Sequence, residues 1–166
     1  MLFEICCLVY DAIDMSQGAK RTLLAHTVSM AGSWWGILLS TFVVYLISPI
    51  SETKLLNFFL WIFVPTVSSE LLKLLIRRPR PVDRGEDVKV KAYGYSFPSS
   101  HTVAAFMVAS WILLVPELRW WSYLFIVWPI FVAWSRVWLR AHDGIDVAGG
   151  VAFAAISTGV AWVLNK

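Results

Sequence analysis

Three polar clusters in this chain combine residue types that can bind and cleave a phosphate ester. The first has the sequence KLLIRRPRP, in which Lys73 lies inside a predicted helix and Arg80 follows the proline-terminated helix end. A lysine ammonium and an arginine fork that converge on one anion suit phosphate oxygens. Basic residues are also the usual finish of a membrane-spanning helix, so this cluster alone leaves both interpretations open.

The second cluster, PSSH, stands directly before an apolar run and ends at His101. A serine here would cap a helix whose first backbone N–H groups lack partners within the helix, and such an N-terminus favours anions. Histidine titrates near neutral pH, so His101 is a candidate proton donor to a departing oxygen. An ordinary helix cap followed by a polar histidine fits the same residues.

The third cluster, SRVWLRAHDGID, places His142 and Asp146 four residues apart. On a helix the two would share one face, where the carboxylate could accept the proton of one ring nitrogen. The other nitrogen would then keep a lone pair that can attack phosphorus. Arg136 would add a phosphate contact. A polar contact between two helices is an equally good explanation of the pair by itself.

Long apolar blocks must position these clusters. The 166 residues are 58% hydrophobic and 15% charged, which is unusual for a soluble domain and indicates that a bilayer is the solvent. We expect one all-α integral membrane domain over residues 1–166 with about five transmembrane helices. The blocks lie at 31–50, 55–76, 100–116, 120–137 and 145–164.

The order of the spans brings the clusters to one membrane face. The second span ends where the third begins, and the fourth ends where the fifth begins, so these four ends meet the same water. All three polar clusters lie there. Together they supply a nucleophile, a carboxylate that orients it, a proton donor and several phosphate ligands.

The N-terminal segment, residues 1–27, differs from the spans. It has no basic region before its apolar part and carries Glu4 and Asp11, which argues against a cleaved signal peptide. We expect one or two amphipathic, interfacial helices with a break near Gly18.

With these motifs the chain resembles the type 2 phosphatidic acid phosphatases, the PAP2 family. That family's signature is Lys-x6-Arg-Pro, Pro-Ser-Gly-His and Ser-Arg-x5-His-x3-Asp, and all three blocks occur here in order, from Lys73 to Asp146. The one departure is Ser100, which stands where the pattern has glycine. Its backbone N–H survives, so we expect phosphate binding to persist, with slight crowding from the side chain.

The resemblance implies a core like that of the haloperoxidases and a two-step reaction without a metal or other cofactor. In it His142 is the nucleophile, His101 protonates the leaving group and Asp146 orients His142. The residues that hold phosphate would be Lys73, Arg80, Ser99, Ser100 and Arg136. Outside the signature, the cations Arg77, Arg78 and Arg140 could hold a second phosphate or a headgroup, or could simply be solvated at the interface.

Two other classes of protein deserve comparison. Two histidines and an aspartate could bind zinc, but the cations Lys73, Arg80 and Arg136 would repel a divalent ion. A transporter should show inverted repeats or matching broken helices, and the five unequal spans show neither. Nucleic acid is a poor partner for a basic patch built onto membrane spans.

The resemblance limits the substrate to a few candidate lipids and favours one orientation in the membrane. The resemblance implies an anionic membrane lipid and a bacterial branch of the family, with undecaprenyl diphosphate, phosphatidylglycerol phosphate, phosphatidic acid and lipid A 1-phosphate as candidates. The excess of Lys and Arg beside the clusters would place them in the cytoplasm. The resemblance to the family implies the outer face instead. Cations that serve to bind phosphate should be left out of the count of Lys and Arg, so we expect a multi-pass inner-membrane protein with a periplasmic site.

Overall fold

Helices make up the regular structure of this protein. The computed structural model describes residues 17–30, 32–47, 51–90, 92–115 and 122–164, and in these residues it has no strand. The elements are α2 (Gln17–Met30), α3 (Trp34–Ile47), α4 (Glu52–Ile76), the short 3₁₀ helix η1 (Val82–Arg84), α5 (Ser100–Leu114), α6 (Ser122–Trp138) and α7 (Gly144–Leu164).

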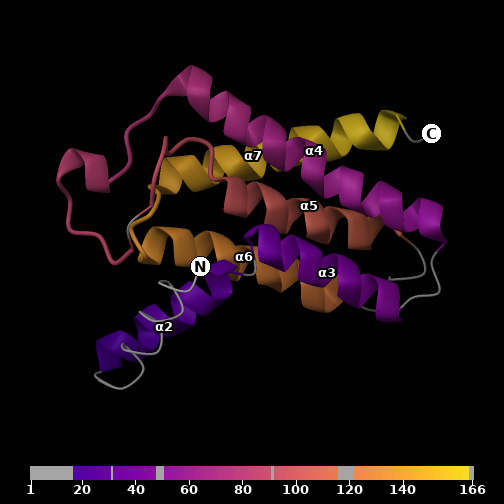
Figure 1. Ribbon diagram of the computed structural model, residues 1–166, viewed down its shortest axis with the longest axis horizontal. Coiled ribbons are helices and arrows are strands. Elements are labelled where there is room, and N and C mark those ends of the chain that lie inside the picture. Colours follow the sequence, from indigo (N-terminus) through magenta and orange to yellow (C-terminus); the bar gives the residue numbers. More distant parts are fainter. Residues whose placement is uncertain (1–16, 31, 48–50, 91, 116–121, 165–166) are drawn as a thin grey trace.

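Helix α5 is the centre of the bundle. It packs against α4, α6 and α7, and it runs between them in Figure 1. Its residues Val103, Ala105, Met107 and Val108 are at most 1% exposed. Small side chains along α5 allow close approach of its neighbours, which is how helices pack tightly in membranes.

Large apolar side chains are exposed on the outside of α4. On α4, Lys73 and Ser69 are buried, whereas Leu71 and Leu75 are 59% and 79% exposed. At this end of α4 polar groups therefore face the interior and large apolar groups face outward, as expected where hydrocarbon surrounds the helices. Both α4, with 25 residues, and α7, with 21, are long and apolar enough to cross a membrane.

The other expected spans correspond to shorter described helices. Helices α3, α5 and α6 have 14, 15 and 17 residues, and positions 31, 48–50, 116 and 120–121 lie outside the described residues. The number of spans therefore stays a prediction. At the N-terminus, α2 begins one residue before Gly18, where a break was expected, and residues 1–16 are outside the described part.

Two glycines near the start of α7 set how closely it approaches α5. A Cβ atom on Gly150 would lie 2.8 Å from the backbone oxygen of Ser99, and one on Gly149 would overlap the ring of Phe97. The N–H of Ser99 also donates to the backbone oxygen of Asp146 at 3.0 Å. The second and third polar clusters are thereby joined through backbone at one end of the bundle.

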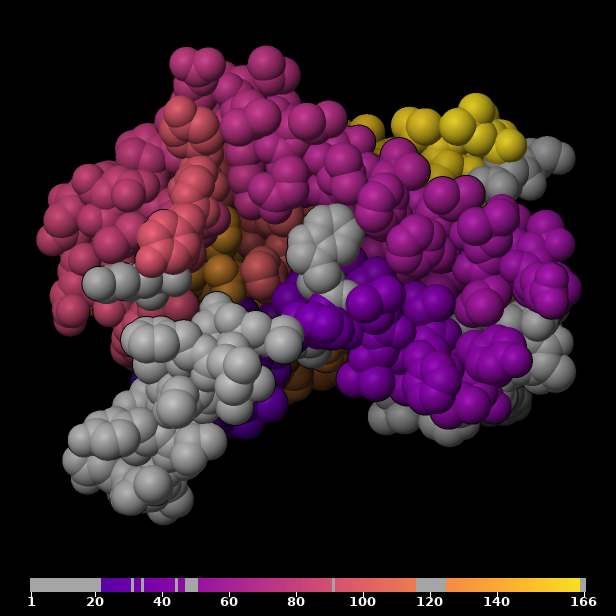
Figure 2. All heavy atoms as spheres, in the orientation of Figure 1, coloured from indigo at the N-terminus to yellow at the C-terminus, as the bar shows by residue number. Residues whose placement is uncertain are grey.

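A loop covers this end of the bundle from one side. It connects α4 to α5 and includes η1. In the space-filling view a hollow lies between the loop and α4, and atoms from the later, orange part of the chain are visible inside it (Figure 2). The candidate site lies at this end.

Candidate functional site

Residues of all three polar clusters meet at this end of the bundle. Lys73 lies in the last turn of α4, His101 in the first turn of α5, Arg136 near the end of α6, and Asp146 in the first turn of α7. The polar residues of the site are almost entirely enclosed: Lys73, Arg80, Ser96, Ser99, Ser100, Arg136, His142 and Asp146 are each at most 6% exposed. His101 is half-buried.

Contacts to His142 define its tautomer. Its Nε2 lies 3.2 Å from Nη1 of Arg80. A guanidinium group only donates hydrogen bonds, so Nε2 must be the acceptor and must carry a lone pair. The proton of the neutral ring is therefore on Nδ1, which faces Ser96 Oγ at 3.3 Å. This tautomer leaves the lone pair of the neutral ring on Nε2.

The electrostatic surroundings keep His142 neutral. Burial, followed by the positive charges of Arg136, Arg80 and Lys73, lowers the pKa of His142 from 6.5 to about 4, against the opposing effect of Asp146. At neutral pH the imidazole is thus uncharged, and the lone pair on Nε2 is available. Burial likewise lowers the pKa of Arg80, which remains a cation in this range.

Asp146 reaches His142 through a serine, which differs from the expected contact. His142 is not on a helix shared with Asp146, because α7 begins only at Gly144. Nδ1 and Asp146 Oδ2 are 3.8 Å apart, too far for a direct hydrogen bond. Ser96 Oγ lies between them and donates to Oδ2 at 2.5 Å. The hydroxyl can accept from Nδ1 while it donates to the carboxylate.

Further groups fix the Asp146 carboxylate. The backbone N–H of Asp143 donates to its Oδ2 at 2.8 Å. Arg78 Nε lies 3.1 Å from its Oδ1, an ion pair in which neither atom has hydrogen-bond alignment. Arg78 also pairs with Asp143 at 2.9 Å, and Asp143 pairs with Arg84 at 3.0 Å. The hydrogen bonds from Arg84 and then Arg78 lower the pKa of Asp143.

The three cations outside the family signature are placed differently from one another. Arg78 lies between the carboxylates of Asp143 and Asp146 and pairs with both. Arg77 ends α4 in a left-handed conformation, and its Nε donates to Leu74 O at 2.9 Å. Arg140 donates to the backbone oxygen of Asp87 at 3.3 Å. Arg77 and Arg140 are exposed at this end of the bundle.

Lys73, Arg80 and Arg136 converge on the same region from three segments. Lys73 Nζ is paired with Glu70 at 2.9 Å, and Arg136 Nη1 donates to Ser29 Oγ on α2. Arg80 donates to the backbone oxygens of Gly94 and Ala141, at 2.8 and 2.9 Å. Burying three cations this close together is costly, and an oxyanion bound among them would offset that cost.

The N-terminus of α5 adds backbone donors to these cations. Ser99 occupies the N-cap position, as expected, but its side chain makes no capping hydrogen bond. Its Oγ instead accepts from Thr102 Oγ1 at 3.1 Å. The N–H groups of the first turn are thus not used by the cap and remain suited to an anion.

Ser100 accommodates its side chain away from this anion site. Its Oγ lies 3.0 Å from Ser69 Oγ on α4, within hydrogen-bond distance, and both serines are buried. We expected slight crowding at the glycine position of the motif. The hydroxyl is instead directed to α4, so the departure from the pattern ties α5 to the helix that carries Lys73.

Several residues of this arrangement were missed from sequence. Ser96 lies in the connection before α5, where a serine gives no periodic or motif signal. Its role comes from the fold, because the backbone N–H of Ser96 donates to Arg78 O at 2.8 Å and holds the loop against the site. No pattern in the sequence marked Ser29 on α2 either. Arg84 and Asp143 read as ordinary surface charges until their pairing is known.

Comparisons with known proteins agree with this architecture. Residues 54–166 match the family model of the PAP2 superfamily. The crystal structure of a transmembrane PAP2-type phosphatidylglycerolphosphate phosphatase from Bacillus subtilis has a TM-score of 0.71 and 21% identity, over 87% of this chain and 76% of that one. The crystal structure of Aquifex aeolicus LpxE has a TM-score of 0.71 and 22% identity, over 86% and 85%.

These matches confirm the family and the fold class expected from the sequence. The fold is all-helical in the described residues, two of its helices can span a bilayer, and the similar structure from Bacillus subtilis is described as transmembrane. The family model covers more than half of the chain and includes every motif from Lys73 to Asp146. The protein is therefore membrane-embedded, and it belongs to the PAP2 superfamily.

Proposed function

We propose that this protein is a membrane phosphatase that hydrolyses the phosphate monoester or diphosphate of a lipid through a phosphohistidine at His142. The observation that carries the proposal is the placement of the two ring nitrogens of His142. Its Nε2 lone pair faces Arg80, beside two other buried cations, while Nδ1 faces the Ser96 hydroxyl that leads to Asp146. This arrangement offers an oxyanion site and a neutral nucleophile at one place.

Substrate binding would release the nucleophile. In the structure Arg80 Nη1 donates to His142 Nε2. A phosphoryl oxygen that accepts this N–H in place of the ring nitrogen would free the lone pair and bring phosphorus next to it. Lys73, Arg136 and the backbone N–H of Ser100 would hold the other oxygens, since phosphoryl transfer depends chiefly on positioning and charge stabilisation.

The first chemical step then forms a bond from Nε2 to phosphorus as the bond from phosphorus to the leaving oxygen breaks. That oxygen is the ester oxygen of a lipid monophosphate or the bridging oxygen of a lipid diphosphate. His101 gives its proton to the departing oxygen. The phosphorylated imidazole carries positive charge while Nδ1 keeps its proton. Asp146 would stabilise that charge through the Ser96 hydroxyl, which accepts from Nδ1 and donates to the carboxylate.

Water completes the cycle in the second step. His101 accepts a proton from a water molecule. The oxygen of that water bonds to phosphorus as the bond from phosphorus to Nε2 breaks. Inorganic phosphate leaves, and His101 is again protonated for the next lipid. The protein's own residues supply every group that this cycle needs, so the proposal includes no metal.

A panel of lipids tests this function and narrows the substrate. We expect the purified protein in detergent to release phosphate from at least one of four lipids: undecaprenyl diphosphate, phosphatidylglycerol phosphate, phosphatidic acid and lipid A 1-phosphate. EDTA should leave the rate unchanged, and vanadate should inhibit, because the cations and His142 suit an oxyanion. Loss of activity in EDTA that zinc restores would instead favour a metal-dependent hydrolase, and no release from any lipid would contradict the proposal.

We also propose that the site faces the periplasm in a multi-pass inner-membrane protein. This rests on the family, because the cations near the site serve phosphate and so weigh little in a charge count. With five spans, the C-terminus would then be cytoplasmic. A fluorescent reporter fused after Lys166 should therefore fold and emit in the cytoplasm, whereas an active periplasmic phosphatase reporter at that position would reverse the orientation.

A further inference from the structure

Arg78 joins three segments around the site. Its Nη2 donates to Asp143 Oδ2 at 2.9 Å, and its Nε lies 3.1 Å from Asp146 Oδ1. Its backbone oxygen accepts the N–H of Ser96 at 2.8 Å. We propose that Arg78 is a positioning residue, which holds the Asp146 carboxylate and the Ser96 hydroxyl where they can orient His142. The proposal rests on the function above, in which His142 is the nucleophile.

The Arg78 side chain fixes the rotation of the Asp146 carboxylate. One carboxylate oxygen, Oδ2, accepts from Ser96 Oγ at 2.5 Å and from the Asp143 N–H at 2.8 Å. The other, Oδ1, is buried and has no hydrogen-bond partner among the described residues, but the Arg78 guanidinium lies beside it. A buried carboxylate oxygen without a compensating positive charge is costly. A rotation that turned Oδ2 away from Ser96 would break this pairing, so Arg78 opposes it.

The contact to two carboxylates depends on the shape of arginine. Two nitrogens of one planar guanidinium, Nη2 and Nε, reach Asp143 and Asp146. Asp143 is the last residue before α7, which begins at Gly144, and Asp146 is in the first turn of that helix. Arg78 therefore ties the turn that carries His142 to the start of α7. A lysine, with a single ammonium group, cannot keep both contacts in the same geometry.

The backbone of the same segment holds the loop that carries Ser96. Besides the bond from the Ser96 N–H to Arg78 O, the Nε of Arg80 donates to Gly94 O at 2.8 Å. The loop is thus attached at two points to the chain that follows α4. Because the Arg78 contact to Ser96 uses a backbone oxygen, it survives a change of side chain. Substitution of Arg78 therefore tests the guanidinium separately from the attachment of the loop.

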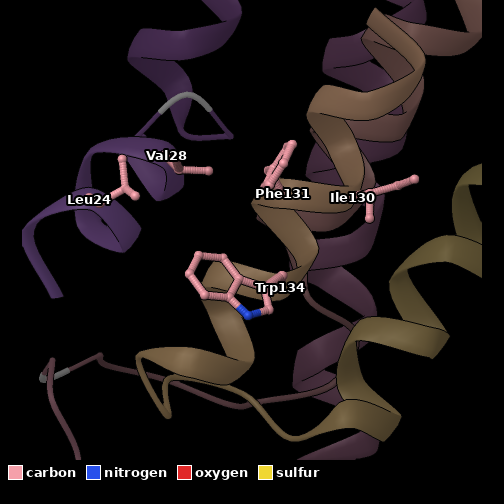
Figure 3. Close-up of a pocket in the computed structure, with 5 residues that line it drawn as sticks. All are labelled: Leu24, Val28, Ile130, Phe131 and Trp134. Atoms are coloured by element: carbon pink, nitrogen blue, oxygen red, sulfur yellow. The ribbon is translucent and has the colours of Figure 1, made fainter. Parts of the chain in front are cut away.

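The side of the bundle where α2 meets α6 offers no such charge. Arg136 donates there to Ser29 Oγ. The groove between the same two helices, shown in Figure 3, is lined by Leu24, Val28, Ile130, Phe131 and Trp134. None of these five side chains is charged, so they cannot balance the carboxylate of Asp146. The positive charge beside Asp146 Oδ1 comes from Arg78, on the loop side.

Arg78→Met tests the inference, because methionine keeps an unbranched side chain but has no charge and no donor. We expect kcat to fall about 10- to 100-fold on any lipid that the parent hydrolyses, since a misplacement of about 1 Å can cost ~10²-fold. KM and the vanadate concentration for half inhibition should stay within about twofold of the parent, because Lys73, Arg80 and Arg136 still hold the oxyanion. Arg78→Lys should recover part of the loss, since its ammonium keeps a positive charge beside Asp146.

Arg84→Met is the matched control. The side chain of Arg84 is 31% exposed, against 33% for Arg78, and its ion pairs are with Asp143 and Glu86. Since partly exposed pairs of this kind contribute little, kcat should fall by less than about fivefold.

A double variant separates positioning from a general effect on the fold. If Arg78 acts through Asp146, Arg78→Met combined with Asp146→Asn should turn over no more slowly than Asp146→Asn alone, within about twofold. A contribution to the fold in general would instead lower the rate by the same factor in both backgrounds.

Parent-like kcat in Arg78→Met would overturn the inference. So would an equal loss in Arg84→Met, a full further loss in the Asp146→Asn background, or a loss confined to KM, which would mean that Arg78 binds the substrate. If Arg78→Met shows no cooperative thermal unfolding, Arg78→Lys takes its place in the same comparison and is judged by the same outcomes. A parent protein that hydrolyses no lipid, or a fully active His142→Ala, would instead refute the proposed function itself.

Discussion

His142→Ala is expected to release no phosphate above background from any lipid that the parent protein hydrolyses. The variant removes Nε2, the atom that the proposed reaction uses to attack phosphorus and that lies 3.2 Å from Arg80 Nη1. Loss of a covalent nucleophile lowers kcat by on the order of a million-fold in other hydrolases. The measurement is phosphate release by purified variant and parent at equal concentration in the same detergent.

A control is needed because His142 is buried at 2% exposure. Thr66→Val removes another buried hydrogen-bonding group, a hydroxyl that donates only to Ile62 of its own helix. It should keep near-parent activity and a similar thermal unfolding midpoint. If Thr66→Val behaves as described and His142→Ala keeps more than a few per cent of the parent rate, His142 is not the nucleophile.

Asp146→Asn is expected to lower kcat by about 10³- to 10⁴-fold with little change in KM. The carboxylate accepts hydrogen bonds from Ser96 Oγ and from the backbone N–H of Asp143. An amide can present its N–H₂ group to Ser96, which would reverse the hydroxyl and favour the tautomer with the proton on Nε2. The phosphorylated ring would also lose the compensating negative charge.

Asp143→Asn is the matched control, because Asp143 is also an ion-pair partner of Arg78 but its side-chain oxygens accept from Arg78 and Arg84. It should cost far less than Asp146→Asn. Ser96→Ala completes the comparison: if Ser96 joins Asp146 to His142, the double variant should be no slower than Asp146→Asn alone. An unchanged rate in Asp146→Asn would exclude Asp146 from the mechanism.

The sequence was sufficient to predict which polar groups the fold brings together, and the reason is spacing. Lys73 and Arg80, the PSSH segment, and Arg136, His142 and Asp146 each fall within short stretches next to apolar blocks. Helix ends that meet the same water must bring such stretches together. The membrane class also followed from composition, because helices that cross the hydrocarbon of a bilayer require long uncharged blocks.

Contacts between distant segments were not accessible in this way. The link from Asp146 to His142 depends on Ser96, 50 residues earlier in the chain than Asp146, and on a loop held by the Ser96 N–H to Arg78 O bond. A helical spacing of four residues predicted a direct contact, but the chain leaves α6 at Trp138 and enters α7 only at Gly144. The 3.8 Å between the two side chains follows from that irregular turn.

The same holds for the contribution of α2. The sequence indicated amphipathic, interfacial helices over residues 1–27, and nothing in it indicated that Ser29 would contact Arg136. That contact requires the tight approach at Gly32, which depends on the position of Val132 and His101. Residues that complete a site through tertiary packing leave no local pattern from which to predict them.

The central claim is that His142 carries the phosphoryl group during turnover, and chemical trapping of that intermediate tests it most directly. Parent protein would be mixed with a lipid whose phosphate carries ³²P, quenched in denaturant at alkaline pH within the first turnover, and digested for peptide mapping. We predict acid-labile, alkali-stable label on the peptide that contains His142, and none in His142→Ala. Label on another residue would contradict the account. So would a first turnover that releases all of the phosphate while the His142 peptide stays unlabelled.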